Sequence, residues 1–116
     1  MKHVKVLIAP LLGLGLVACA SFATNLFRSE QTVVNAAYAA YEGWTNYLAT
    51  GKVSVQASNE VKQARLHFAA SVSVVEGWRA AYQTNSAVKP QAQAALDALT
   101  SDSSNVVWLV NYWKGH

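Results

Sequence analysis

The tripeptide Glu-Gly-Trp occurs twice in the chain, at Glu42-Gly43-Trp44 and at Glu76-Gly77-Trp78. Two carboxyl groups can work as general acid and general base when both reach one substrate bond. If the segments that hold them are antiparallel helices joined near Lys52, the two carboxylates lie roughly 20 Å apart along the helix axes. We therefore expect no acid–base pair and no enzymatic activity from these residues.

The same register predicts ion pairs between the two helices. Glu42 falls level with Lys62 or Arg65, and Glu76 falls level with Arg28. Exposed pairs of this kind stabilise a fold by about 0–1 kcal/mol each.

Gly43 and Gly77 precede the two tryptophans. Glycine inside a helix costs about 1 kcal/mol relative to alanine. We expect each glycine to lie where the indole of a neighbouring helix packs on bare backbone.

The remaining chemistry-bearing side chains show no motif. His67 and the terminal His116 have no Cys, Asp or Glu partner at metal-ligand spacing. No serine stands in a Gly-x-Ser-x-Gly turn, and no glycine loop could cradle a phosphate. The sequence predicts no catalytic residue, no metal, no cofactor and no small-molecule substrate.

Residues 1–23 have the three parts of an export signal. Lys2 and Lys5 form a positive front, residues 6–17 form an apolar run, and small residues follow at 18–21. The apolar run is shorter than the roughly 30 Å hydrocarbon core of a bilayer, since a helix rises about 1.5 Å per residue.

The run ends in Leu16-Val17-Ala18-Cys19, which contains the only cysteine. This ending resembles the lipobox of bacterial lipoproteins, in which the cysteine thiol receives a diacylglyceryl group and a peptidase cuts just before it. The resemblance implies a signal peptide at residues 1–18, a lipidated tether at 19–24, and membrane attachment through Cys19. Ala20 follows the cysteine in place of Asp, which implies delivery to the periplasmic face of the outer membrane.

Two alternatives to lipidation stay open. Ala18-Cys19-Ala20 and Ser21-Phe22-Ala23 both fit ordinary signal cleavage, which would give a secreted soluble helical protein. Without cleavage, residues 4–23 approach the length of an uncleaved anchor.

Most of the net positive charge of the chain comes from this signal. Nine Lys and Arg oppose six Asp and Glu, and Lys2 and Lys5 belong to the signal. The remaining chain is nearly neutral and has the length of one small domain. This balance does not favour a nucleic-acid partner, which requires clustered positive charge.

Residues 25–116 have the periodicity of helices. A first apolar stripe begins after Asn25 and ends near Thr50-Gly51, where glycine can adopt the left-handed cap conformation. A second segment begins at an N-cap, Ser54 or Ser58, and ends at Asn85-Ser86. The stripes consist of Leu26, Val33, Ala37, Tyr41 or Ala40, Trp44 and Leu48 in the first helix, and of Val61, Ala64, Phe68, Val72, Val75 and Tyr82 in the second.

A third helix begins at Lys89-Pro90, because proline is tolerated in the first helical turn. We predict one continuous or slightly bent helix across the polar stretch 101–104. Its stripe consists of Ala92, Leu96 or Ala95, Leu99, Val106, Val110 and Trp113.

Short loops between three helices imply antiparallel neighbours. We predict an all-α fold: a small antiparallel three-helix bundle, or a helical hairpin with a third helix alongside, preceded by a cleaved signal peptide. Many alanines make the helix surfaces shallow and allow close approach of the axes.

Five aromatic residues fall near one end of this bundle, opposite the anchor: Trp44, Tyr47, Trp108, Tyr112 and Trp113. They could fill the core, they could bind a partner, since Trp and Tyr are favoured interface anchors, or residues 106–113 could contact a bilayer.

In composition the chain is similar to small helical lipoproteins of bacterial prophages. We expect a non-enzymatic helical module at the cell envelope that binds a protein partner or itself, or supports the envelope structurally. The alternative is a phage-derived membrane-active lipoprotein that acts in lysis or in superinfection exclusion.

Overall fold

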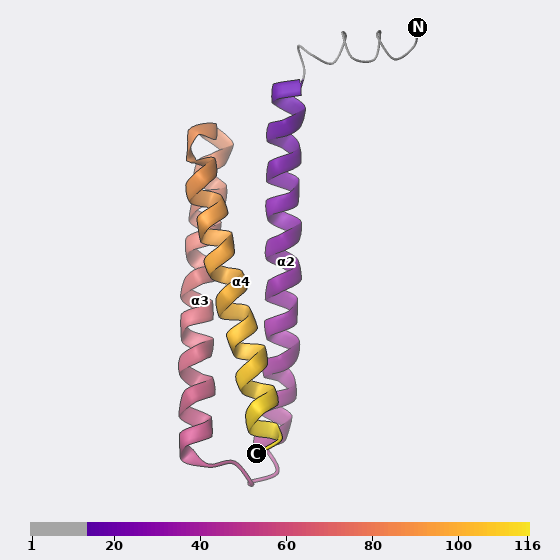
Figure 1. Ribbon diagram of the computed structural model, residues 1–116, viewed down its shortest axis with the longest axis vertical. Helices are drawn as coiled ribbons and strands as arrows, with labels where there is room; N and C mark the ends of the chain where they lie inside the picture. Colours follow the sequence, from indigo (N-terminus) through magenta and orange to yellow (C-terminus); the bar gives the residue numbers. More distant parts are fainter. Residues whose placement is uncertain (1–13) are drawn as a thin grey trace, which may run out of the picture.

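The computed structural model describes the backbone of residues 14–116 and the side chains of residues 21–116. Helix α2 spans Leu14–Leu48, α3 spans Val55–Thr84, and α4 spans Lys89–Lys114, preceded by a 3-10 turn, η1, at Ser86–Val88. The helices lie alongside one another in up-down-up order (Figure 1). The predicted all-α three-helix bundle is confirmed. Most of the predicted signal peptide, and the Leu16, Val17, Ala18 and Cys19 side chains, lie outside the described residues.

Local signals in the sequence set the helix boundaries. Ser54 caps α3, and its hydroxyl accepts a hydrogen bond of 3.1 Å from the Ala57 backbone N–H. Gly51 has a positive φ of 71° in the turn after α2, a conformation that glycine adopts without steric cost. Asn85 ends α3, and Pro90 lies in the first turn of α4. These predicted boundaries are confirmed.

The start of α2 differs from the prediction. The sequence predicts a tether at residues 19–24 before a helix that begins at Asn25, but these residues belong to α2, which begins at Leu14. Phe22 explains the difference, since its ring contacts Tyr82 of α3 edge to face, with centroids 4.8 Å apart. Lys89 at the start of α4 lies 4.8 Å from the centre of the same ring. Contacts with both other helices therefore hold this turn in the bundle.

The core follows the predicted stripes, with some additions. α4 packs against both α2 and α3, which contact one another less. The buried residues that the stripes omit are Glu30, Val34, Ala57 and Ser103. The stripe residues that are only partly buried are Val33, Ala40, Tyr41, Leu48, Val72 and Trp113. The buried apolar residues are Leu26, Val34, Ala37, Trp44, Ala57, Val61, Ala64, Phe68, Val75, Tyr82, Ala92, Ala95, Leu96, Leu99, Val106 and Val110.

The polar stretch 101–104 remains inside a continuous α4, as predicted. The buried Ser103 hydroxyl donates a 2.7 Å hydrogen bond to the backbone carbonyl of Val33 in α2. The Ser71 hydroxyl of α3 donates to the Asp102 carboxylate. Polar groups of one turn are thus paired with both neighbouring helices, so burial does not leave them unsatisfied.

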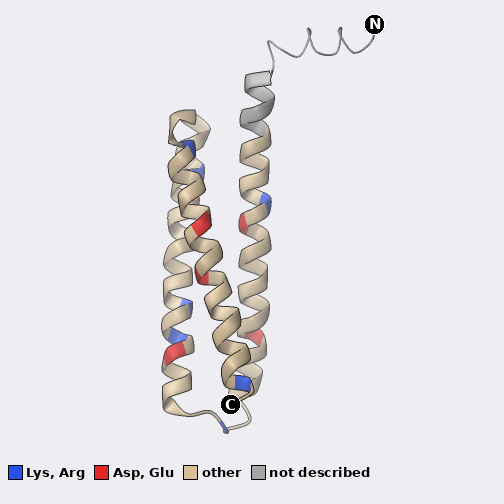
Figure 2. Cartoon of the chain, viewed as in Figure 1, with Lys and Arg blue, Asp and Glu red and all other residues tan. Residues whose placement is uncertain are grey.

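Charged residues are scattered along all three helices, and neither sign gathers at one end of the bundle (Figure 2). Within the described part of the chain, no helix is both long enough and apolar enough to cross a membrane.

Candidate functional site

The predicted cluster of five aromatic residues divides into two groups with different environments. Trp44 is only 1 % exposed and belongs to the core. Tyr47 is partly buried against the same core, with its ring centroid 5.7 Å from that of Trp44. The Trp44 ring is therefore not available to a partner, whereas part of the Tyr47 side chain remains exposed.

The aromatic residues of α4 are accessible. Trp108 is 60 % exposed and Tyr112 is 37 % exposed. Their spacing of four residues places them on one face of the helix, where the rings stack with centroids 5.2 Å apart. The His116 ring stacks on Tyr112 at 4.1 Å. The last turns of α4 therefore carry a column of three rings at the surface.

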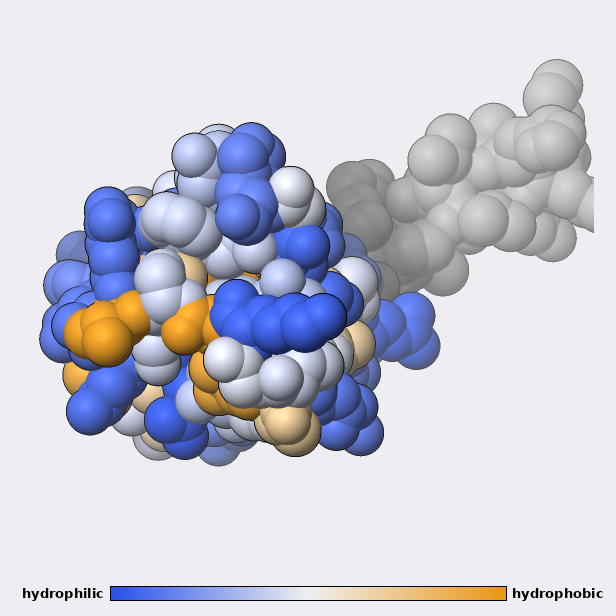
Figure 3. Space-filling view, turned by 90° about the horizontal axis from the view of Figure 1, so that it is seen from below, coloured by the Kyte–Doolittle hydropathy of each residue, from blue (hydrophilic) through white to orange (hydrophobic). Residues whose placement is uncertain are grey.

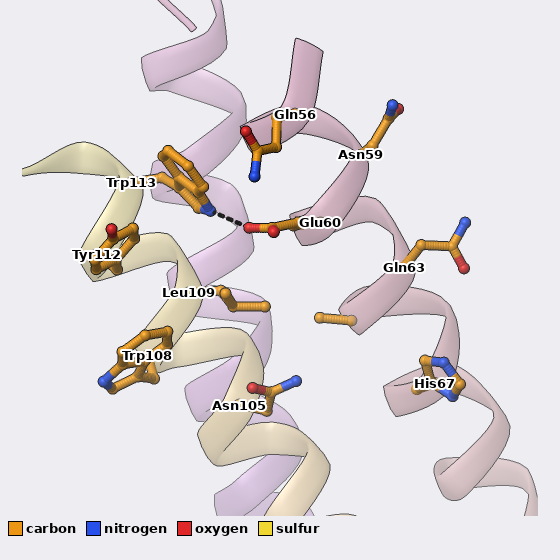
Figure 4. A pocket seen from close by; sticks show the side chains of 11 residues that line it. Gln56, Asn59, Glu60, Gln63, His67, Asn105, Trp108, Leu109, Tyr112 and Trp113 are labelled. Atoms are coloured by element: carbon orange, nitrogen blue, oxygen red, sulfur yellow. Dashed lines mark hydrogen bonds between the residues drawn. The ribbon is translucent and has the colours of Figure 1, made fainter. Parts of the chain in front are cut away.

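Trp108 and Tyr112 border a groove between α3 and α4 (Figure 4). α4 crosses the bundle obliquely, and its last turns lie beside α2 (Figure 1), where Lys114 Nζ comes within 3.5 Å of the position that a Gly43 Cβ would occupy. The groove has a volume of about 650 Å³, which lies within the range of ligand-binding clefts. It is lined by Gln56, Asn59, Glu60, Gln63, Ala64 and His67 of α3 and by Asn105, Trp108, Leu109, Tyr112 and Trp113 of α4.

Trp113 and Glu60 connect the two walls of the groove. The Trp113 indole Nε1–H donates a 2.7 Å hydrogen bond to Glu60 Oε2, as Figure 4 shows. The second carboxylate oxygen of Glu60 has no hydrogen bond within the described chain. Leu109 points from α4 toward α3 and forms part of the apolar floor.

The polar lining of the groove consists mainly of carboxamides. Gln56, Asn59, Gln63 and Asn105 are exposed, and none of their amide groups forms a side-chain hydrogen bond within the described residues. No Lys or Arg is among the lining residues, and Glu60 carries the groove's one permanent charge. The groove thus offers neutral donors and acceptors beside aromatic surface.

The sequence prediction missed this groove because it used only the apolar stripe of α3 and left the polar residues between unassigned. Gln56, Asn59, Glu60 and Gln63 do share one helix face, since they are three or four residues apart. That spacing was visible in the sequence. Its position opposite the α4 aromatics was not, because the rotation of two helices about their axes depends on packing.

The predicted ion pairs of the Glu-Gly-Trp repeats do not form. In the part of the chain that the structure describes, the salt bridge that forms is between Arg79 and Glu30, with Nη1 and Oε1 2.9 Å apart. Arg65, a predicted partner of Glu42, lies over the Tyr41 ring, 4.9 Å from its centre. The register was correct to about a turn, but a shift of one residue turns a side chain by about 100° around the helix.

Glu30 is the buried member of the observed pair. Its side chain is 2 % exposed, whereas the Arg79 side chain is 28 % exposed. Burial raises the pKa of the Glu30 carboxyl; the attraction of Arg79 opposes this shift and the repulsion of Glu76 adds to it. The pair lies between α2 and α3, outside the groove.

The two glycines are not packing positions for an indole, and that prediction is wrong. A Cβ added at Gly77 would meet nothing within 4 Å, and one at Gly43 would meet only the flexible end of Lys114. Both residues therefore lie in ordinary helix without close contact.

His67 lines the groove and His116 stacks on Tyr112. Among the described residues, no group of three or more His, Cys, Asp or Glu side chains could hold a metal ion.

Comparison with models of protein families, with curated proteins and with solved structures finds no match to this chain. The arguments below therefore rest on the sequence and on the geometry of the bundle.

Proposed function

We propose that the chain is a lipid-anchored, non-enzymatic binding protein of the bacterial cell envelope, which uses the groove between α3 and α4 to bind its partner. Anchoring is supported by Leu16-Val17-Ala18-Cys19 at the end of an apolar run with Lys2 and Lys5 before it. Binding is supported by the exposure of Trp108 and Tyr112 at the groove, since exposed aromatic residues of this size mark interaction surfaces.

The position of the groove relative to Cys19 is the observation that carries the proposal. Cys19 lies in the first turns of α2, and α2 continues without a break to Leu48. Residues 19 and 44 are therefore roughly 40 Å apart along one helix. The C-terminal end of α2 and that of α4 meet at the same end of the bundle (Figure 1). A lipid on Cys19 would thus hold the groove well away from the bilayer.

Seen from this distal end, the surface is mostly polar, with a small area of apolar residues exposed among them (Figure 3). The Val55 side chain at the start of α3 is 77 % exposed. The end that faces away from the anchor therefore has both the aromatic groove and accessible apolar surface.

Replacement of Cys19 by Ser tests the anchor. Ser has no thiol to receive the diacylglyceryl group, so the variant should accumulate as an unprocessed precursor and lose incorporation of labelled palmitate. Ser21→Ala is the matched control, because it changes one hydroxyl two residues away and leaves the four lipobox residues intact; it should be processed normally. Normal processing of Cys19→Ser, shown by mass spectrometry of the mature N-terminus, would refute lipid anchoring.

A further inference from the structure

We infer that the ligand of the groove between α3 and α4 is a neutral oligosaccharide, whose pyranose rings stack on Trp108 and pair through their hydroxyl groups with the carboxamides of Gln56 and Asn105. This inference deepens the proposed function and rests on it, since it names the ligand class of the same groove.

The aromatic wall matches one side of a sugar ring. Tyr112 stacks on one face of the Trp108 indole, with an angle of 13° between the ring planes. Trp108 is nevertheless 60 % exposed, which leaves its other face accessible. A pyranose ring has a face of C–H bonds that packs against the electron-rich face of an aromatic ring. The indole therefore offers a flat platform for one sugar unit.

The polar wall matches the hydroxyl groups at the edges of the sugar rings. A hydroxyl group both donates and accepts hydrogen bonds, and a carboxamide does the same through its NH₂ and its carbonyl oxygen. Gln56 presents such a group from α3 and Asn105 presents one from α4, both into the space between the helices, whereas the amide ends of Asn59 and Gln63 are directed away from α4 (Figure 4). The second carboxylate oxygen of Glu60 adds an acceptor beside Trp113. A chain of sugars would meet these groups in succession.

The charge of the groove selects against other ligands. The lining has no Lys or Arg that could neutralise a phosphate or a carboxylate, and the Glu60 carboxylate repels anions. The groove is open to solvent between two helices, and its apolar lining consists of Ala64, Leu109 and the rings of Trp108, Tyr112 and Trp113. A peptide would need a deeper apolar pocket for an anchor side chain, whereas a stacked sugar needs only the platform.

The test uses the four tryptophan indoles as separate reporters. The full-length chain, labelled with ¹⁵N and held in amine-oxide detergent that carries no sugar, is titrated with chitotriose and with cellotriose. Either trisaccharide should shift the indole N–H resonances of Trp108 and Trp113 with a Kd on the order of 1 mM. Trp44 and Trp78 should stay unchanged, because Trp44 is in the core and Trp78 is not among the lining residues.

Two variants test the stacking contact: Trp108→Ala removes it, and Tyr38→Ala is the control. Trp108→Ala should weaken binding about 5- to 10-fold, the loss expected for one stacking contact. Tyr38→Ala removes an aromatic residue of matched exposure, 59 %, outside the groove, and should leave the titration unchanged. Trp108 is exposed, so its replacement should not unfold the bundle; an unchanged far-ultraviolet circular dichroism spectrum checks this.

Several outcomes would overturn the inference. They are the absence of shifts with both sugars, shifts confined to Trp44 or Trp78, and equal binding by Trp108→Ala. A shift of the Trp108 resonance on concentrating the protein alone would assign the groove to a second copy of the chain instead. The titration is independent of the anchor: sugar binding together with normal processing of Cys19→Ser would refute lipid attachment and leave the ligand assignment standing.

Discussion

Arg79 is predicted to stabilise the bundle mainly by neutralising the buried carboxylate of Glu30. The replacement that tests this effect is Arg79→Met, because methionine keeps most of the aliphatic stem and removes the charge. It also removes the guanidinium from the Phe27 ring, 4.9 Å from its centre, but that loss does not depend on the protonation of Glu30. Glu30 Oε1 would then lose its partner at 2.9 Å while its side chain stays 2 % exposed. A buried carboxylate without a counter-charge is strongly destabilising.

Protonation of Glu30 sets an upper limit on the stability that Arg79→Met can lose. A carboxyl that has lost its partner can take up a proton instead, at a cost of about 1.36 kcal/mol for each pH unit above its pKa in the unfolded chain. For a reference pKa of 4.5, this limit is about 3.4 kcal/mol at pH 7 and about 0.7 kcal/mol at pH 5. Because burial already raises the pKa of Glu30 in the intact pair, part of this cost exists before the mutation. We therefore expect Arg79→Met to lower the free energy of unfolding by about 2 kcal/mol at pH 7 and by less than about 0.7 kcal/mol at pH 5.

Thermal unfolding followed by circular dichroism measures this difference. For a domain of this size, 2 kcal/mol corresponds to a decrease in Tm of roughly 8–16 °C. Arg28→Met is the matched control, since Arg28 is an exposed arginine of α2 for which no ion pair forms within the described residues; it should change Tm little at either pH. A destabilisation by Arg79→Met that is the same at pH 5 and pH 7 would show that the lost interaction is packing, and would refute the electrostatic explanation.

Three further predictions follow from burial and space. The pKa of Glu30 is raised in the folded state, so its contribution to stability is largest at pH below its pKa in the unfolded chain and decreases as pH rises through its pKa in the folded chain. Glu30→Gln should therefore weaken the pH dependence of the free energy of unfolding in this range. An unchanged pH dependence, measured by urea titration at several pH values, would contradict the assignment. Gly77→Ala should raise the free energy of unfolding by about 0.5–1 kcal/mol, because a Cβ there meets nothing within 4 Å; a lower Tm would show that the backbone is closely approached after all. Leu99→Ala should cost about 2–5 kcal/mol, since Leu99 is fully buried, and a loss below about 1 kcal/mol in chemical denaturation would mean that the core is loosely packed there.

The candidate site was predicted only in part. The sequence placed Trp108, Tyr112 and Trp113 near the distal end of the bundle, because distance along a helix follows from residue number. It grouped them with Trp44, which the structure places in the core, and with Tyr47, which packs partly buried against that core. Aromatic residues of the core and of the surface have the same sequence signal when both occur at helical spacing, so exposure could not be separated from burial.

Local chemistry determined the framework of this protein. The apolar period of the three segments predicted the helices, Ser54 and Gly51 predicted where the chain turns, and Pro90 predicted where α4 begins. Each of these signals acts within one or two helical turns, so each is legible in the sequence. The lipobox residues, the apolar run before them and Lys2 and Lys5 are equally local, and the anchoring proposal rests on them.

The packing of all three helices decided the contacts between them and the position of the groove. It buried Glu30 and paired it with Arg79, joined Ser103 to the backbone of α2, and opened the groove beside Trp108. These features depend on how far each helix is rotated about its axis. Successive residues differ by about 100° around a helix, so a shift by one residue replaces a buried face with an exposed one. The rotation is fixed by side chains from three helices at once, which is why no single segment of the sequence could specify it.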